Sequence, residues 1–469
     1  MIGQCQEQVS SRGDAQKAFP LRTRRNPLDE DFKGLVEQTL EEFHVPGISV
    51  AVVDGDATWA EGYGHATLGP AAAPATPSTL YYAGSTTKAF LAALFSLMIE
   101  GPAKSNSEAE ADSSSDAAKY LSPRLAEKGW QTPISRLIRD DFVLRDDAYA
   151  WAQEHLTLED ALSHRTGFPR HDQALAQHYP NDADYGRQND ENSEGEQHPV
   201  TVRDIARSLR HLPMTAEPRA VWRYCNYMYL VASHAAEVLT GGRWLGDTLR
   251  AWIWEPLGMR NTYLSLSDAQ AGPEHLANGY AWDHAHERSG DGGGGYTEVP
   301  FMSLRGGSGA GGIVSNVRDY ARWARCLLRE AAPLSEAGHA ALRTPRMVVP
   351  PEAGPKGFDA GSSTYALGWF ANTYRGWRVL SHGGGMEAYG TEVFLLPDLD
   401  FAVITMGNTA NTSNAAGQLV AWKLIYDRLG VPEDERLDWK ATYVSLLIYP
   451  SGTKPLLLFS MASSLHYRN

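Results

Sequence analysis

The sequence predicts an α/β (α+β) fold, in which one antiparallel sheet is assembled from both ends of the chain and flanked by helices. Strand-like runs occur at Ile48–Val53 and Thr58–Tyr63 and return only after residue 362. Between them, from about 134 to 340, helical spacing dominates. The chain has 469 residues and is 43% hydrophobic, which suffices for one large core or two smaller ones.

The N-terminal elements follow from apolar spacing and turn residues. Helical spacing covers roughly residues 28–43, and the turn signal Asp54-Gly55-Asp56-Ala57 joins the first two strands. Ala83-Gly84 reads as the entry to a buried helix, because an unbroken apolar run follows at 89–99. Capping-box starts at Thr157, Thr201 and Asn316 mark later helices, with Asp in place of the preferred Glu or Gln.

The C-terminal part returns to strands separated by turns and closes with an amphipathic helix over Ala415–Leu429. We expect these strands at Tyr365–Asn372, Trp377–Ser381, Gly390–Leu396 and Phe401–Met406. No internal repeat is visible.

The predicted domain organisation combines distant segments. Residues 28–100 and 340–430 form the sheet domain, and residues 101–339 form a mainly helical, all-α domain. Polar insertions interrupt the latter near 101–119, 180–199 and 284–297. Residues 1–27 read as a disordered tail and 431–469 as a C-terminal tail.

Composition argues against several partners. Net charge is −14 and no long basic tract occurs, so we expect no nucleic acid. Three scattered cysteines, Cys5, Cys225 and Cys326, indicate neither a disulfide framework nor a metal cluster. With no visible secretory signal and no apolar run long enough to span a bilayer, a cytoplasmic protein is expected. The sequence does not predict the oligomeric state.

The most informative motif is Ser85-Thr86-Thr87-Lys88, a hydroxyl and an amine three residues apart at the start of the buried helix. Residues i and i+3 share a helix face, so the two side chains should lie together. Burial lowers the pKa of a lysine and makes it a usable base, which favours an activated serine nucleophile. A second copy, Ser451-Gly452-Thr453-Lys454, lies between prolines and reads as a turn.

Further motifs follow in a fixed order. Tyr224-Cys225-Asn226 resembles the Tyr-x-Asn element of class C β-lactamases and related esterases, and the glycine-rich turn His382-Gly383-Gly384-Gly385 resembles their third element. The segments 162–169 and 310–319 also resemble family segments. From about residue 30 to 430 the chain therefore resembles the serine β-lactamase and penicillin-binding-protein family, which implies a serine β-lactamase-like fold.

The resemblance implies roles for these residues. Ser85 would form an acyl-enzyme, with Lys88 and Tyr224 in its proton network; which of the two accepts the serine proton stays open. Asn226 would accept from Lys88 and donate to the substrate acyl group. Backbone N–H groups of Ser85 and Gly385 would form the oxyanion hole. Glycines 383–385 allow close approach, and His382 would contact substrate. No metal or other cofactor is implied.

Departures from the family pattern shape the functional prediction. His382 stands where most lactamases have lysine, so strong binding of an anionic group is in doubt, and Met228 stands where glycine is usual. Only about 40 residues follow position 430, so we expect no lipocalin-like domain; residues 444–469 match no family segment. We read His164 as structural and residues 306–310 as a flexible loop bordering the site.

The prediction is thus a metal-free serine hydrolase of an ester, lactone or amide of a small molecule. Two alternatives stay open. One is an acyltransferase of secondary metabolism, which passes the acyl group to an alcohol. The other is a non-catalytic ligand-binding module, against which the joint presence of Ser85, Lys88 and Tyr224 argues.

Overall fold

The computed structural model describes residues 25–103, 120–176, 200–283, 295–302 and 308–448. The predicted tail 1–27 therefore lies almost wholly outside the described residues. The same holds for most of the insertions near 101–119, 180–199 and 284–297, and for the C-terminal tail beyond 448. The division into two domains stays a prediction.

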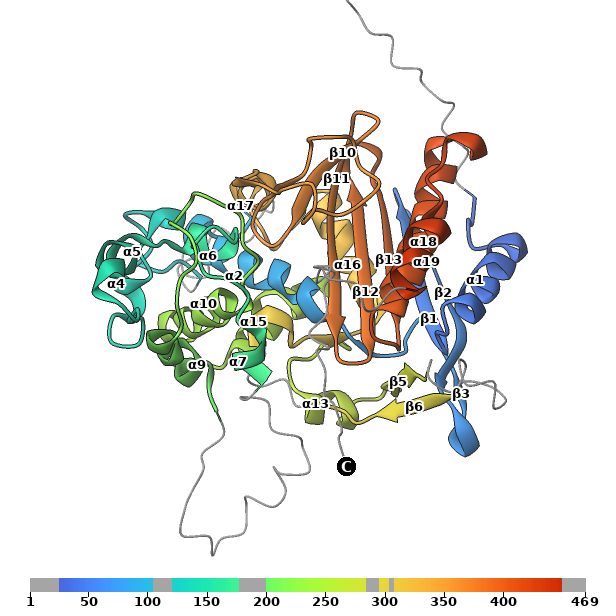
Figure 1. Cartoon of the computed structure of the whole chain (residues 1–469), viewed down its shortest axis with the longest axis horizontal. Coiled ribbons are helices and arrows are strands. Elements are labelled where there is room, and N and C mark those ends of the chain that lie inside the picture. Colours follow the sequence, from blue (N-terminus) through green and yellow to red (C-terminus); the bar gives the residue numbers. More distant parts are fainter. Residues whose placement is uncertain (1–24, 104–119, 177–199, 284–294, 303–307, 449–469) are drawn as a thin grey trace, which may run out of the picture.

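An antiparallel sheet occupies the centre of the molecule (Figure 1). Within the described residues it has nine strands in the order β3-β2-β1-β13-β12-β11-β10-β9-β8. Because β1 pairs with β13, the sheet joins the two ends of the chain, as the sequence predicts. The strands are β1 (Gly47–Asp54), β2 (Ala57–Thr67), β3 (Ala73–Pro74), β8 (Met347–Val348), β9 (Thr364–Tyr365), β10 (Phe370–Tyr374), β11 (Trp377–Met386), β12 (Tyr389–Leu396) and β13 (Phe401–Gly407).

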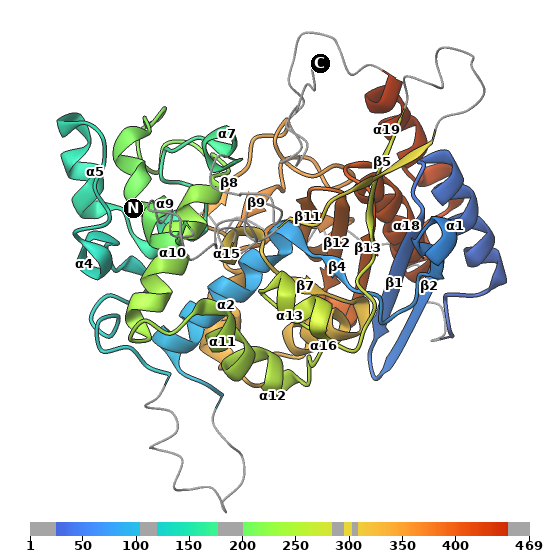
Figure 2. The same cartoon turned by 90° about the horizontal axis from the view of Figure 1, so that it is seen from below.

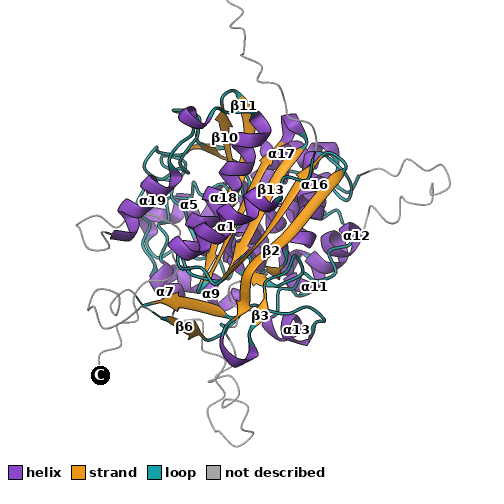
Figure 3. Ribbon diagram, turned by 90° about the vertical axis from the view of Figure 1, so that its right-hand side faces the viewer, coloured by secondary structure: helices purple, strands orange, loops and turns teal. Residues whose placement is uncertain are grey.

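Helices cover both faces of this sheet, and for that reason every residue of β1, β12 and β13 is buried. Helices α1 (Glu30–Glu42) and α18 (Thr412–Leu429) cover one face, and α19 (Trp439–Ile448) packs on α18 (Figure 3). On the opposite face, α16 (Val317–Leu328) packs against β1 and β13. Each face carries its own hydrophobic core.

The core on the α16 face continues into a helical region whose centre is α2 (Thr87–Glu100), shown in Figure 2. Every residue of α2 from Thr87 to Met98 is buried, which agrees with its unbroken apolar run. Around it lie α4 (Ser135–Ile138), α5 (Ala150–His155), α6 (Leu158–Leu162), α7 (Asp172–Ala176), α9 (Val202–Ser208), α10 (Asn226–Leu239), α11 (Leu245–Leu249), α12 (Glu255–Leu257), α13 (Leu266–Ala271), α15 (Ser308–Gly311) and α17 (Glu336–Arg343). Two small sheets pair β4 (Tyr81–Tyr82) with β7 (Val314–Ser315) and β5 (Gly279–Trp282) with β6 (Tyr296–Val299).

The predicted caps are largely confirmed. Thr157 and Thr201 form complete capping boxes with Asp160 and Asp204. Asn316 caps α16, but the side chain of Asp319 does not close the box: it accepts from the backbone N–H of Asn261 at 2.8 Å. This carboxylate therefore ties α16 to the preceding chain instead of to its own cap.

The predicted single strand at Tyr365–Asn372 is wrong. A tight turn divides it into β9 and β10, with Ala366 N–H donating to the Trp369 carbonyl at 2.8 Å. Gly368 allows the turn because it adopts φ +77°, and a Cβ there would lie 2.9 Å from the backbone N of Ala89. The turn is thus pressed against the first residues of α2.

Two predicted irregular segments are also wrong. His382-Gly383-Gly384-Gly385 is no turn: it lies inside β11 and pairs with β12. The chain reverses later, at Glu387-Ala388, between β11 and β12. In the predicted loop 306–310, Ser308, Gly309 and Ala310 belong to the short helix α15, while residues 306–307 lie outside the described part of the chain. The glycines of β11 allow this strand to pack closely against the turn that precedes α2.

Candidate active site

Ser85 and Lys88 lie side by side at the entry to α2, as their spacing predicts. Ser85 belongs to a 3-10 turn, Gly84–Thr86, that leads directly into α2. Lys88 Nζ lies 3.0 Å from Ser85 Oγ. Lys88 is fully buried, whereas Ser85 retains 9% exposure. The amine is thus enclosed in the protein, whereas Ser85 keeps a small exposed area.

Three hydrogen-bond partners surround the Lys88 amine. Besides Ser85 Oγ, Nζ donates to Asn226 Oδ1 at 2.8 Å and to the Ala310 carbonyl at 2.6 Å. Burial, assisted by the nearby charge of Arg170, lowers the pKa of Lys88 well below its ordinary value, and the charge of Asp172 opposes this shift. The site therefore favours a neutral amine with fixed hydrogen-bond partners.

Tyr224 lies beside the serine–lysine pair. Its ring centroid is 4.9 Å from Lys88 Nζ, and the residue is 5% exposed. Burial raises the pKa of Tyr224, while the charge of Arg170 and a hydrogen bond with Ser85 lower it less strongly. The phenol is therefore a protonated group in contact with the serine hydroxyl.

His164 positions the Tyr224 segment. Its ring lies 4.1 Å from the Tyr224 ring, its Nδ1 accepts from Cys225 N–H at 3.1 Å, and its carbonyl accepts from Arg223 N–H at 2.8 Å. Burial and the charge of Lys88 keep the pKa of His164 well below 6.5, so the ring is neutral. These contacts agree with a structural role, as the sequence predicts.

The glycines of β11 bring this strand against the Ser85 turn. A Cβ on Gly384 would lie 2.0 Å from the Ala83 carbonyl oxygen, and a Cβ on Gly84 would lie 2.7 Å from Gly385 N. On this edge β10 pairs with β11 only as far as Ser381, so the strand is open beside the turn. Two backbone segments thus meet at Ser85, and their contact requires glycine.

His382 lies deeper than a substrate contact needs. It is 1% exposed, its Nε2 lies 2.9 Å from the Tyr365 hydroxyl and its Nδ1 lies 2.6 Å from the Gly383 carbonyl. A carbonyl only accepts, so Nδ1 carries the hydrogen and Nε2 accepts from Tyr365. Burial, together with the charge of Lys88, lowers the pKa of His382 to about 3. This imidazole is therefore neutral and supports β11 from within.

The structure adds three groups that the sequence reasoning missed: the Ala310 carbonyl, Arg170 and Asp172. Asp172 Oδ1 accepts from Asn226 Nδ2 at 2.9 Å, and its other oxygen accepts from Arg170 Nε. Arg170 and Asp172 directly follow the segment 162–169 that resembles the family. The sequence could have indicated that such a group exists, because the Asn226 side chain has an NH₂ donor as well as an oxygen acceptor, and a buried NH₂ group needs an acceptor of its own.

A cleft of about 420 Å³ opens beside these residues. A predicted site residue, Tyr224, lies in its wall, whereas two larger hollows of the described chain contain none in theirs. Its walls are partly aromatic and partly cationic: Pro169, Arg170, His171, Trp222, Arg223, Tyr224 and Ala353. Tyr224 thus forms part of a surface that a substrate can reach.

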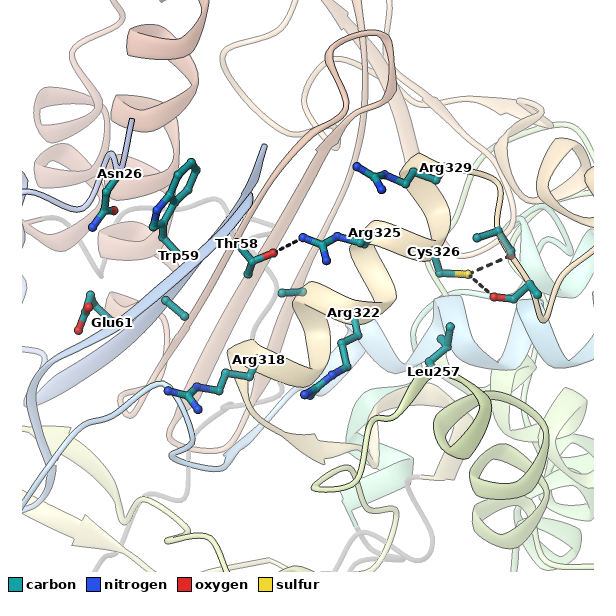
Figure 4. Close-up of a pocket in the computed structure, with 14 residues that line it drawn as sticks. Asn26, Thr58, Trp59, Glu61, Leu257, Arg318, Arg322, Arg325, Cys326 and Arg329 are labelled. Carbon is teal, nitrogen blue, oxygen red and sulfur yellow. Dashed lines mark hydrogen bonds between the residues drawn. The ribbon is translucent and has the colours of Figure 1, made fainter. Parts of the chain in front are cut away.

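A larger hollow of about 850 Å³ lies elsewhere, between β2 and α16 (Figure 4). Four arginines of one helix face enter it, but Arg322 pairs with Asp319, and Arg329 pairs with Asp56 and Asp400. Arg325 is hydrogen-bonded to the start of β2, as Figure 4 shows. None of the predicted site residues lines this hollow, so its size does not make it the reaction site.

Among the described residues, no group of three or more His, Cys, Asp or Glu side chains is arranged to hold a metal ion. Nor is any helix of the described chain long and apolar enough to cross a membrane.

Fold and site together place the protein among the serine β-lactamase-like proteins. Comparison with known proteins agrees: the family described as Beta-lactamase matches residues 32–425. The chain therefore belongs to the beta-lactamase family.

Two fungal relatives are hydrolases by name. "Unguisins hydrolase ungD'" of Aspergillus campestris is 42% identical over 425 residues, covering 90% of this chain and 69% of its own. "Unguisins hydrolase ungD" of Aspergillus violaceofuscus is 39% identical over 435 residues, covering 90% and 68%. Family and relatives together make this chain a hydrolase of the beta-lactamase family.

Solved structures share the fold at low identity. The octameric penicillin-binding protein homologue of Pyrococcus abyssi has a TM-score of 0.65 at 22% identity, over 87% of this chain and 78% of that one. The D-amino acid amidase of Ochrobactrum anthropi, in complex with L-phenylalanine, has a TM-score of 0.59 at 19% identity, over 85% and 97%. The predicted serine β-lactamase-like fold is thus confirmed.

Proposed function

We propose that the protein is a serine hydrolase that forms an acyl-enzyme on Ser85 and releases the acyl group to water. The observation that carries this proposal is the set of acceptors around Lys88. Asn226 Oδ1 and the Ala310 carbonyl, at 2.8 and 2.6 Å, can only accept hydrogen bonds. A neutral amine has two N–H groups and one lone pair. Both hydrogens are therefore taken, and the lone pair faces Ser85 Oγ.

This arrangement supports Lys88 as the base that accepts the Ser85 proton. Burial lowers the pKa of the amine, so it is ready to take a proton near neutral pH. The serine oxygen then attacks the acyl carbonyl while its proton moves to Nζ. The question that the sequence left open, lysine or tyrosine, is answered in favour of lysine in this proposal.

Tyr224 would act as the proton donor to the leaving group. Burial raises its pKa, which argues for a protonated phenol and against a phenolate. In acylation the phenol gives its proton to the departing nitrogen or oxygen, and the proton held by Lys88 replaces it. Hydrolysis of the acyl-enzyme runs the same transfers in reverse, with water in place of the leaving group.

The backbone N–H groups of Ser85 and Gly385 would stabilise the oxyanion. The close approach of β11 to the Ser85 turn supports this role, because Gly84 and Gly385 pack backbone against backbone. Asn226 keeps one amide hydrogen beyond the one it gives to Asp172, and this hydrogen is available for the acyl carbonyl.

The substrate would be an amide, ester or lactone of a small molecule. The names of the two relatives, at 42% and 39% identity, support unguisins as the first compounds to test. His382 is neutral, since burial lowers its pKa to about 3, so this position offers no fixed cation for a substrate carboxylate.

A fluorophosphonate probe tests the proposal, because it reacts only with an activated serine. We expect one adduct on the wild type and none on Ser85→Ala. Ser96→Ala is the matched control, since Ser96 is a buried serine of the same helix and should leave labelling unchanged. Equal labelling of wild type and Ser85→Ala would refute the nucleophile. Incubation with unguisins, followed by mass analysis, then shows whether water or an added alcohol accepts the acyl group.

A further inference from the structure

Arg170 and Asp172 form an ion pair directly against the reacting groups. Arg170 Nε donates to Asp172 Oδ2, and the Arg170 guanidinium lies 4.9 Å from the centroid of the Tyr224 ring. Both side chains are largely buried, with 25% and 17% exposure, and Arg170 lines the cleft. Arg170 therefore contacts Tyr224, and Asp172 contacts Asn226, which is hydrogen-bonded to Lys88.

Asp172 determines which way the Asn226 amide points. A carboxylate only accepts, so the side of the amide that faces Asp172 at 2.9 Å must be Nδ2. The opposite atom, Oδ1, is then the one that faces Lys88 at 2.8 Å. Without this carboxylate the amide would be free to turn and present its NH₂ group to the lysine. Such a turn would remove one of the acceptors that direct the Lys88 lone pair to Ser85.

The pair also brings opposite charges near Lys88. The positive charge of Arg170 lowers the pKa of the buried lysine, which burial lowers most, and the negative charge of Asp172 raises it. The other titratable groups that face the amine are uncharged at pH 7, namely Tyr224, Tyr229, Cys225, His164 and His382. Changing either member of the pair should therefore act on the lysine directly.

We infer that Asp172 and Arg170 are a positioning pair, which locks the Asn226 amide and balances the charge around Lys88 while Arg170 holds the Tyr224 ring. This inference rests on the proposed serine hydrolase function, since it assigns the pair a task in activating Ser85. Neither residue touches the reacting serine in the contacts described; they act through Asn226, Lys88 and Tyr224.

The rate of fluorophosphonate labelling, measured as a function of pH, tests the inference. Labelling requires a neutral Lys88 and falls as pH drops through its pKa. Asp172→Asn keeps an acceptor for Asn226 but removes the anion. The acidic limb, that is the low-pH part of the curve of labelling rate against pH, should therefore move to lower pH. Arg170→Gln removes the cation, so the limb should move to higher pH. Arg170→Lys keeps the charge and should restore the wild-type limb.

Loss of the hydrogen bond is tested separately with Asp172→Ala. At the pH optimum its labelling rate should fall by about tenfold to a hundredfold, the equivalent of one hydrogen bond to a charged group. Asp398→Asn is the matched control: Asp398 also pairs with an arginine, Arg378 at the start of β11, but lies in the 3-10 turn Pro397–Leu399 that follows β12. It should change neither the rate nor the limb.

The two claims fail in different ways. If the wild type is labelled at Ser85 but both Asp172→Asn and Arg170→Gln keep its pH profile, the positioning pair is refuted and the hydrolase proposal stands. If both variants move the low-pH side of the profile in the same direction, the claim that Arg170 and Asp172 act oppositely on Lys88 is refuted. If the wild type is not labelled at all, the hydrolase proposal itself fails.

Discussion

A methyl group on Gly384 should separate β11 from the Ser85 turn. The new Cβ of Gly384→Ala would lie 2.0 Å from the Ala83 carbonyl oxygen and 3.3 Å from Ser85 N. Carbon and oxygen need about 3 Å or more, so the two backbones must part by roughly 1 Å. No side-chain rotation relieves this contact, because both neighbours are main-chain atoms. The Ala83 carbonyl is also held by the Thr86 hydroxyl at 2.8 Å.

This separation has two expected consequences. Overpacking of a buried site costs about 1–3 kcal/mol, so the melting temperature should fall without loss of the fold. Misplacing one oxyanion donor costs about a hundredfold to a thousandfold in rate, so fluorophosphonate labelling of Ser85 should slow by that factor.

Gly383→Ala is the matched control on the same strand. Its Cβ would meet the end of the Glu392 side chain at 2.9 Å instead of the Ser85 turn. We therefore expect a stability loss with a labelling rate close to that of the wild type. A folded Gly384→Ala variant that labels within threefold of the wild type would refute the close-approach argument, and with it the role of β11 in the oxyanion site.

Three further predictions concern buried titratable groups. Lys88→Met should slow labelling by at least about a hundredfold, because the base is lost. Since burial lowers the pKa of Lys88 from 10.5, the lysine costs stability at neutral pH, and in denaturant titrations its cost relative to Met should shrink toward pH 10.5. Tyr224→Phe should lower turnover of an ester by about two to four orders of magnitude; near-normal turnover would remove it from the mechanism. Burial raises the pKa of Glu392 from 4.5 to about 7. The free energy of unfolding that this residue costs therefore grows between pH 4.5 and pH 7, to about 3 kcal/mol. Glu392→Gln should remove that dependence, and an unchanged pH profile of unfolding would contradict it.

Much of the fold follows from the sequence because its signals are local and strong. The apolar run of α2 and the threonine caps each act within a few residues. The prediction of one strand over Tyr365–Asn372 was wrong for a tertiary reason. The chain turns at Gly368 with a positive φ, and the backbone of α2 leaves no room there for a Cβ. Such contacts join segments that the sequence holds far apart.

The site shows the same division. Ser85, in the 3-10 turn, and Lys88, in the first turn of α2, lie three residues apart, so their contact could be predicted from spacing alone. The glycines of β11 suggest a turn when read locally, yet they form a strand because the Ser85 turn packs against them. Arg170 and Asp172 escaped prediction because their importance arises from contacts with Tyr224 and Asn226, more than 50 positions along the chain.

The most direct test of the central claim is rapid-quench mass spectrometry with an activated ester. The account predicts an acyl adduct that forms within the first turnover, maps to Ser85 and is absent from Lys88→Met and Ser85→Ala. An adduct at any other residue, or turnover at full rate with no adduct in the lysine variant, would contradict it.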